Sequence, residues 1–185
     1  MVPSRGFYDY AWNPITGCKH GCDYCYARRI FNQRRESFDP TFHQERLVEP
    51  ANEKKASVIF VGCYADVMGG WVPAEWIQQV IDSLVDWHTF IFITKNPERY
   101  REFSFPDNVY LGVTVESPDK LWRFDEIQSP NKTFASIEPI MDDFTGVDLS
   151  MFDWVVAGKT IFSSSPMQKK WIKSITHDNL YEIVR

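Results

Sequence analysis

The chain has 185 residues, of which 44% are hydrophobic and 24% are charged, and its formal net charge is −5. This length is enough for one well-buried core, so we expect a single domain over residues 1–185. The acidic balance disfavours sequence-independent binding to duplex nucleic acid, and the ordinary composition excludes a disordered or fibrous chain.

Short β-branched or aromatic runs alternate with longer helical patterns along the chain. The runs that predict strands are 8–13, 57–62, 89–94, 108–115, 133–138 and 153–158. The segments that predict helices are 22–36, 73–87, 96–103, 117–128 and 166–184. Pro73, Pro97 and Pro118 mark three helix starts, because the first helical turn does not use the N–H that proline lacks. No helix is expected over 139–152.

Apolar strands separated by helices predict a parallel sheet that is covered by helices. Six such units can form a doubly wound sheet or an incomplete (β/α) barrel. In both arrangements the functional residues gather at the carboxyl ends of the strands. The first fourteen residues lack the apolar region of a signal peptide, and the apolar runs are too short to cross a bilayer. We therefore expect a cytoplasmic protein with no membrane association.

Three cysteines, Cys18, Cys22 and Cys25, are spaced Cys-x-x-x-Cys-x-x-Cys on one short segment. Three thiolates on one loop suit a [4Fe-4S] cluster, because each binds one iron and the fourth iron stays open for another ligand. Gly17 and Gly21 would let the loop backbone curl tightly. The spacing favours metal binding over disulfide bonds.

A structural zinc site is the alternative interpretation, with His20 or His43 as the fourth ligand. Zinc ribbons normally carry two spaced cysteine pairs, whereas Cys63 lies far along the sequence, beside an apolar strand pattern. A purely electron-transferring cluster is a further alternative.

The cysteine spacing, with the aromatic Tyr24 before the third cysteine, resembles the radical SAM superfamily. Seven segments, in order, also resemble the phage Gp37/Gp68-like (DUF5131-type) subfamily, and they are WNPITGC, GCDYCYA, FVGCYADVM, ITKNPERY, LGVTVES, SIEPI and DWVVAG. The resemblance implies an α/β fold, a partial (β/α)6 TIM-like barrel with parallel strands and the cluster loop after the first strand. It also implies an enzyme whose [4Fe-4S] cluster reductively cleaves S-adenosyl-L-methionine (AdoMet) to a 5′-deoxyadenosyl radical that acts on an unknown substrate.

The resemblance implies that the second and fourth predicted strands end in cofactor-binding residues. Gly62 and Asp66 lie where related enzymes hold the amino group of methionine, and Tyr24 lies within the cluster loop. Thr114, Glu116 and Ser117 lie where the ribose hydroxyls and the carboxylate are recognised. The alternatives are a turn cap for Asp66 and a helix N-cap for Ser117.

The remaining strand ends supply further candidates. Lys95 is expected to steady the carboxylate of AdoMet, and the backbone of Val156 and Gly158 to face the adenine. Glu138 lies in an apolar strand and needs a partner, because an unpaired buried carboxylate is costly. That partner is the cofactor or substrate, or else Arg99 or Arg123. The resembling family usually continues Gly-Gly-Glu-Ser after the last strand, where this chain has Gly-Lys-Thr-Ile.

Cys63 is a candidate hydrogen donor in the reaction, although a cysteine at a strand end is more often a small buried hydrophobe. The expected partners are a reductant such as flavodoxin or ferredoxin, a small-molecule, peptide or nucleic-acid substrate, and a protein that closes the open side of the barrel. The basic run from Arg28 to Arg35, with the abundant aromatic residues, is compatible with nucleic-acid modification or repair. A non-catalytic iron-sulfur or zinc module is the alternative from a different class.

Overall fold

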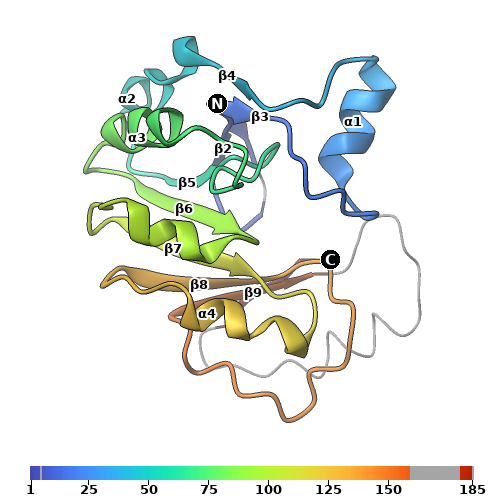
Figure 1. Cartoon of the computed structure of the whole chain (residues 1–185). Helices are drawn as coiled ribbons and strands as arrows, with labels where there is room; N and C mark the ends of the chain where they lie inside the picture. Colours follow the sequence, from blue (N-terminus) through green and yellow to red (C-terminus); the bar gives the residue numbers. More distant parts are fainter. Residues whose placement is uncertain (5, 159–179, 185) are drawn as a thin grey trace.

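The computed structural model describes residues 1–4, 6–158 and 180–184, and in this part of the chain eight strands form one curled, mostly parallel sheet. The strand order is β1-β2-β5-β6-β7-β8-β9-β10, which makes a half barrel rather than a flat doubly wound sheet (Figure 1). The parallel strands are β2 (Tyr10–Trp12), β5 (Val58–Val61), β6 (Thr89–Thr94), β7 (Val109–Thr114), β8 (Lys132–Ile137), β9 (Trp154–Gly158) and β10 (Leu180–Val184). At one edge, β1 (Val2–Pro3) pairs antiparallel with β2.

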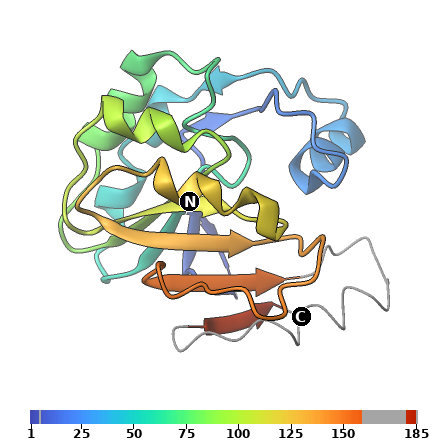
Figure 2. The same ribbon diagram turned by 60° about the horizontal axis from the view of Figure 1, so that its bottom comes forward.

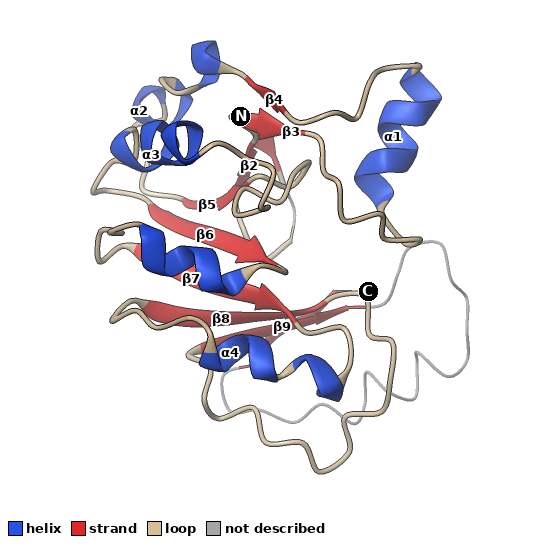
Figure 3. Ribbon diagram, in the orientation of Figure 1, coloured by secondary structure: helices blue, strands red, loops and turns tan. Residues whose placement is uncertain are grey.

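Short helices cover the outer face of this sheet. They are α2 (Glu49–Asn52), α3 (Ala74–Asp82) and α4 (Trp122–Asp125), with the 3₁₀ turns η1 (Gln44–Arg46), η2 (Pro97–Glu102) and η3 (Pro118–Lys120). Helix α1 (Tyr26–Arg34) stands apart, beyond the carboxyl ends of the parallel strands (Figures 1 and 2). A separate pair of strands, β3 (Ile15–Thr16) and β4 (Thr41–Phe42), leads into and returns from the segment that carries α1 (Figure 3).

The two faces of the sheet are built from alternating residues, because successive side chains of a strand point to opposite faces. Phe90 and Phe92 of β6 belong to the large core beneath the outer helices, which also contains Ile77 of α3. Ile91 and Ile93 point the other way and contact a smaller cluster inside the half barrel. Burial on both faces explains why the predicted strands are nearly continuous apolar runs.

Aromatic rings close the inner face toward the amino ends of the strands. The ring of Phe7 stacks on that of Phe134, with centroids 5.6 Å apart. It also meets the edges of Trp154 and Tyr8. The loop before β2 therefore fills the lower part of the half barrel and leaves the carboxyl ends of the strands as the open part.

The predicted strands are confirmed, since each of the six runs contains an observed parallel strand, and the cluster loop follows the first of them. The described sheet has seven parallel strands rather than six, because Leu180–Val184 pairs with the open edge of β9 as strand β10. The helix predicted over 166–184 is therefore wrong at its end, and residues 166–179 lie outside the described residues. A segment beside an unpaired strand edge gains a row of backbone hydrogen bonds there, which the sequence pattern alone does not reveal.

The predicted helices are shorter than expected. The helix predicted over 22–36 begins only at Tyr26, because residues 22–25 remain in the cysteine loop. The segment 96–103 forms the 3₁₀ turn η2, and 117–128 divides into η3 and α4. The stretch 139–152 contains no helix, as predicted. Among the described residues, no helix has the length and apolar character needed to cross a bilayer.

Candidate active site

The three cysteines lie on a loop that runs from β3 to α1 across the carboxyl ends of the strands. Gly17 and Gly21 have φ angles of +86° and +72°, so both adopt the glycine-favoured backbone that the sequence predicts. The Gly17 N–H donates to the carbonyl of Tyr64 (2.9 Å), which ties the start of the loop to the segment after β5. At its end, Cys25 is the N-cap of α1, and its sulfur accepts a hydrogen bond from the Arg28 N–H (3.4 Å).

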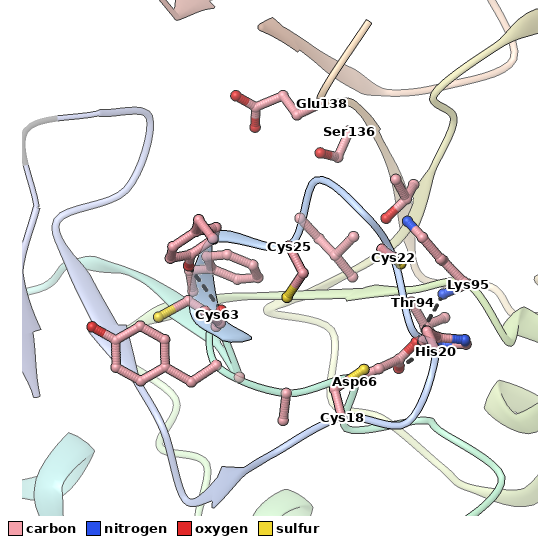
Figure 4. A pocket seen from close by; sticks show the side chains of 18 of the residues that line it. Cys18, His20, Cys22, Cys25, Cys63, Asp66, Thr94, Lys95, Ser136 and Glu138 are labelled. Carbon is pink, nitrogen blue, oxygen red and sulfur yellow. Dashed lines mark hydrogen bonds and ion pairs between the residues drawn. The ribbon is translucent and has the colours of Figure 1, made fainter. Parts of the chain in front are cut away.

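A cavity of about 530 Å³ opens between this loop and the strand ends. Figure 4 shows Ser136 and Glu138 above the cysteines, and Thr94 and Lys95 beside Cys22. The predicted site residues that line it are Cys18, Cys22, Tyr24, Cys25, Gly62, Cys63, Asp66, Lys95, Thr114 and Glu138. The structure thus brings together residues from five separate parts of the sequence.

The cysteine side chains share the cavity without converging on a single point. Among the described residues, no group of three or more His, Cys, Asp or Glu side chains is arranged to hold one metal ion. The zinc ligands considered above are also engaged elsewhere, since His20 bonds to Asp66 and His43 to Thr16. A cubane cluster is larger than one ion and needs its thiolates further apart, so the donor set fits an iron-sulfur cluster better than zinc.

The Cys18 thiol is in an environment that opposes its ionisation. Burial is the main cause and raises the pKa of this thiol to about 11, and the nearby Asp66 adds to the rise. The nearby backbone of His20 opposes the rise in the pKa of Cys18. Metal coordination removes the proton of a thiol outright. Cys18 is therefore expected to become a thiolate when it binds a metal.

Asp66 is a buried carboxylate with four hydrogen-bond donors around it. One oxygen accepts from Thr94 Oγ1 (2.7 Å) and the Met68 N–H (3.0 Å). The other accepts from the Lys95 N–H (3.0 Å) and from His20 Nε2 (2.6 Å), the contact drawn dashed in Figure 4. The turn-capping alternative is therefore observed, and the carboxylate also joins the ends of β5 and β6 to the cysteine loop.

Glu116 is the centre of a second polar group, beyond the end of β7. Its carboxylate accepts from Arg123 Nη1 (2.7 Å) and Tyr24 OH (3.2 Å), and Lys95 Nζ lies 3.6 Å away. Burial alone would raise the pKa of Glu116, but the charges of Lys95 and Arg123 hold it below the ordinary value. Burial, followed by the Glu116 charge, raises the pKa of Tyr24, so this phenol remains a donor.

Cys63 lies on the cavity wall among tyrosines. Its thiol donates to Asn13 Oδ1 (3.3 Å), and its carbonyl accepts from Tyr26 OH (2.8 Å). Burial raises the pKa of the Cys63 thiol, so it keeps its proton near neutral pH. Tyr8 also lines this side of the cavity.

Ser136 and Glu138 project from the end of β8 toward the cavity, two residues apart on the inner face (Figure 4). The Glu138 carboxylate lies over Gly158, where an added Cβ would come within 2.4 Å of Glu138 Oε1. Arg99 and Arg123 serve other groups, since Arg99 donates to backbone carbonyls after Asp66 and Arg123 to Glu116 and the Thr114 carbonyl. The described contacts therefore do not support the alternative that either arginine neutralises Glu138.

Four of the predicted cofactor-binding residues are not part of the described cavity wall. Glu116 lies behind Tyr24 and Lys95, and Ser117 bonds to Asp119. Val156 is buried within the inner apolar cluster, and Gly158 lies beneath the Glu138 side chain. The Ser117 hydroxyl donates to the carboxylate of Asp119 and makes no capping hydrogen bond to η3, so the side chain does not act as the N-cap that the alternative proposed.

Sequence reasoning assigned no cofactor-binding role to His20, Thr94 or Ser136 and considered His20 only as a zinc ligand, although all three line the cavity. A signal for Ser136 was present, because strand alternation places it on the same face as Glu138. For His20 and Thr94 the signal is their common partner Asp66, and this contact is evident only in the folded chain.

The model of the family described as "Protein of unknown function (DUF5131)" matches residues 5–183. No curated protein matches the sequence.

Among solved structures, a spore photoproduct lyase variant superposes with a TM-score of 0.63 at 13% identity, covering 94% of this chain and 62% of that chain. Spore photoproduct lyase complexed with dinucleoside spore photoproduct gives a TM-score of 0.59 at 14% identity, with 93% and 62% covered. A variant with bound AdoMet and dinucleoside spore photoproduct gives 0.58 at 13%, with 93% and 62% covered. The chain thus spans under two thirds of the length of these proteins, and at such identity the likeness concerns the fold.

Proposed function

The chain belongs to the DUF5131 family of proteins of unknown function, and from its fold and its site we propose that it is a radical SAM enzyme of the phage Gp37/Gp68-like type. The observation that carries the proposal is the position of Cys18, Cys22 and Cys25, which line one cavity at the carboxyl ends of a parallel half barrel. Catalytic groups of barrel enzymes lie at this end of the strands. The fold likeness to a structure that contains AdoMet supports the same proposal.

In this proposal the three cysteines hold a [4Fe-4S] cluster. Three thiolates satisfy three irons and leave one position open for a second ligand. The Arg28 side chain donates to the Cys18 carbonyl (3.1 Å), and the Arg28 N–H donates to the Cys25 sulfur, so one residue links the two ends of the loop. The loop backbone is thereby held in shape by the chain itself.

AdoMet is proposed to occupy the cavity beside the strand ends. Thr114, Ser136 and Glu138 offer hydroxyl and carboxylate groups from neighbouring strands, and the ammonium of Lys95 offers a partner for the methionine carboxylate. The backbone of Gly62 lines the side nearest Cys63. The reduced cluster, when bound, supplies the electron that cleaves AdoMet to methionine and a 5′-deoxyadenosyl radical, which abstracts a hydrogen atom from the substrate.

Cys63 is the proposed hydrogen donor to the substrate radical: its thiol gives up a hydrogen atom and becomes a thiyl radical, which one electron from the proposed reductant and one proton would return to the thiol. Its thiol keeps its proton, lines the cavity, and does not belong to the cluster motif. A reductant such as flavodoxin or ferredoxin would deliver electrons to the cluster, and a further partner would close the open side of the half barrel. These partners follow from the proposed chemistry and are part of the proposal.

The experiment is anaerobic purification with iron, sulfide and zinc analysis, followed by dithionite reduction in the presence of AdoMet. We expect about four iron and four sulfide per chain and release of 5′-deoxyadenosine. Cys22→Ala should abolish both, whereas Cys63→Ala should retain the cluster and AdoMet cleavage. Stoichiometric zinc without iron would contradict the proposal, and a full cluster without AdoMet cleavage would favour a non-catalytic iron-sulfur module.

Modification or repair of nucleic acid is the second candidate, within the same chemistry. The observation that favours it is the exposure of Arg29, Arg34 and Arg35 on and just after α1, which stands at the carboxyl-end side of the sheet. Exposed arginines can neutralise phosphates, and the aromatic cavity wall can stack bases. Salt-dependent binding of a single-stranded oligonucleotide, lost in an Arg34→Glu and Arg35→Glu double variant, would support it, and salt-independent or absent binding would count against it.

A further inference from the structure

We propose that Asp66 and Glu116 are positioning residues that clamp the cysteine loop at two points, one in each interval between its cysteines. The inference rests on the proposed function and deepens it. It also changes the role of two residues that the sequence places at the cofactor. Each carboxylate follows a strand, and each receives a side chain that lies between two of the cysteines.

The first clamp lies in the interval between Cys18 and Cys22. His20 Nε2 and Asp66 Oδ2 are 2.6 Å apart, with the Asp66 side chain only 8% exposed. The carboxylate is already fixed by Thr94 Oγ1 at the end of β6 and by backbone N–H groups. His20 therefore bonds to a group whose position is set by the sheet, and not to a mobile surface carboxylate.

This clamp fixes the residue two positions after Cys18. The His20 ring bonds to Asp66 and packs edge-on against Trp71, with centroids 4.8 Å apart. Fixing the imidazole at both places restricts the path of the loop backbone beside Cys18. That path determines where the backbone N–H groups lie relative to the cysteine sulfur, and hydrogen bonds to the sulfurs of an iron-sulfur cluster are among the factors that set its reduction potential.

The second clamp lies in the interval between Cys22 and Cys25. Tyr24 OH donates to Glu116 Oε1 (3.2 Å), and Lys95 Nζ lies 5.4 Å from the centre of the Tyr24 ring. Glu116 is itself held by Arg123, whose guanidinium also donates to the Thr114 carbonyl at the end of β7 (2.6 Å). The phenol is thus anchored to the sheet through a half-buried ion pair.

The two clamps resemble the arrangement by which proteins orient metal ligands. Groups hydrogen-bonded behind a ligand fix its direction, and their loss typically reduces metal affinity about 10- to 100-fold. Asp66 has a donor at each of four acceptor positions, and Glu116 lies behind the cavity wall. Both carboxylates therefore act on the site through the loop, and direct side-chain contacts to AdoMet fall to Lys95, Thr114, Ser136 and Glu138.

The test uses Tyr24→Phe and His20→Phe, which keep an aromatic ring and remove the side-chain donor of each clamp. Tyr110→Phe is the matched control, because it removes a phenol hydroxyl from the inner face at a distance from the loop. Iron-loaded proteins are challenged with a chelator, and the rate of iron loss is followed together with the electron paramagnetic resonance spectrum of the reduced cluster. We expect about tenfold faster iron loss and an altered spectrum in both clamp variants, and wild-type behaviour in the control.

Hydrogen exchange of the metal-free chain provides an independent measurement. The clamps predict faster exchange of the amides of residues 18–25 in both variants, with unchanged exchange in β6 and β7. The inference would be overturned if both variants matched the wild type in the rate of iron loss, in the spectrum and in the exchange of residues 18–25. A variant whose amides exchange faster throughout the sheet has a folding defect, and the other variant then decides the test. If the wild type binds no iron, the proposed function fails, while the exchange measurement still tests the clamps.

Discussion

The outer and inner faces of the half barrel are formed by alternating residues of the same strands, but their composition changes differently along those strands. On the outer face, β6 and β7 present apolar side chains to the helices along most of their length, through Phe90 and Phe92 of β6 and Val109, Leu111 and Val113 of β7. On the inner face, aromatic rings near the amino ends give way to Thr114, Ser136 and Glu138 at the carboxyl ends. The outer face and the amino ends of the inner face thus serve packing, whereas the polar side chains gather at the carboxyl ends of the inner face.

The largest expected effect is a loss of stability when an aromatic ring is removed from the outer face. Phe92 is 1% exposed and packs against Phe105, so Phe92→Ala should lower the free energy of unfolding by about 3–5 kcal/mol. Urea denaturation measures it. Val48→Ala, at a side chain that is 60% exposed, should change stability by less than about 0.5 kcal/mol. A comparable loss in both variants would contradict the assignment of the core.

An effect on binding without an effect on folding is expected at the carboxyl end of the inner face. Glu138→Gln keeps the size of a half-buried side chain at the cavity and removes its charge. If AdoMet occupies the cavity as proposed, it should bind about tenfold more weakly, equivalent to about 1.4 kcal/mol, because a charge-assisted hydrogen bond becomes a neutral one. Isothermal titration calorimetry under anaerobic conditions measures the affinity, and an unchanged affinity would remove Glu138 from the cofactor site.

A smaller effect of the same kind is expected at Gly158. An added methyl group would displace the end of the Glu138 side chain, which is flexible and can move at little energetic cost. Gly158→Ala should therefore weaken AdoMet binding several-fold while stability changes by less than about 1 kcal/mol. Combining it with Glu138→Gln should add little further loss, since both changes act on the same carboxylate.

The smallest effect concerns the pH dependence of the Glu116 group. Burial opposes ionisation, but Lys95 and Arg123 outweigh it and lower the pKa of Glu116 below the ordinary value of 4.5. A carboxyl group with a lowered folded-state pKa stabilises the fold above its unfolded pKa and loses that contribution as the pH falls through the folded pKa. The stability difference between wild type and Glu116→Gln should thus be full at pH 7 and shrink below about pH 4.5. A difference that is constant from pH 7 to pH 3 would contradict it.

Most of the sheet could be predicted from the sequence, because a buried parallel strand is a short apolar run and its carboxyl end is identifiable. That logic correctly placed the cysteine loop, Lys95, Thr114 and Glu138 around one cavity. It failed at Leu180–Val184, where pairing with β9 depends on which sheet edge is open.

The remaining site details depend on side-chain contacts between distant segments. Asp66 was assigned to the cofactor from its place in the chain, whereas its four donors come from several parts of the fold. Gly158 was assigned to adenine, whereas the side chain of Glu138 covers it. Chain position predicts which residues reach the carboxyl end, but not which of them are already bonded to each other.

The rings around Phe7 give the cavity a floor, and this has a kinetic meaning. In the described part of the chain, the stack of Phe7 on Phe134 blocks passage along the inner face toward the amino ends of the strands. Ligands then enter and leave through the mouth at the carboxyl ends. Under the proposed function, methionine and 5′-deoxyadenosine occupy the same cavity as AdoMet and leave through this mouth, so each should inhibit in competition with AdoMet.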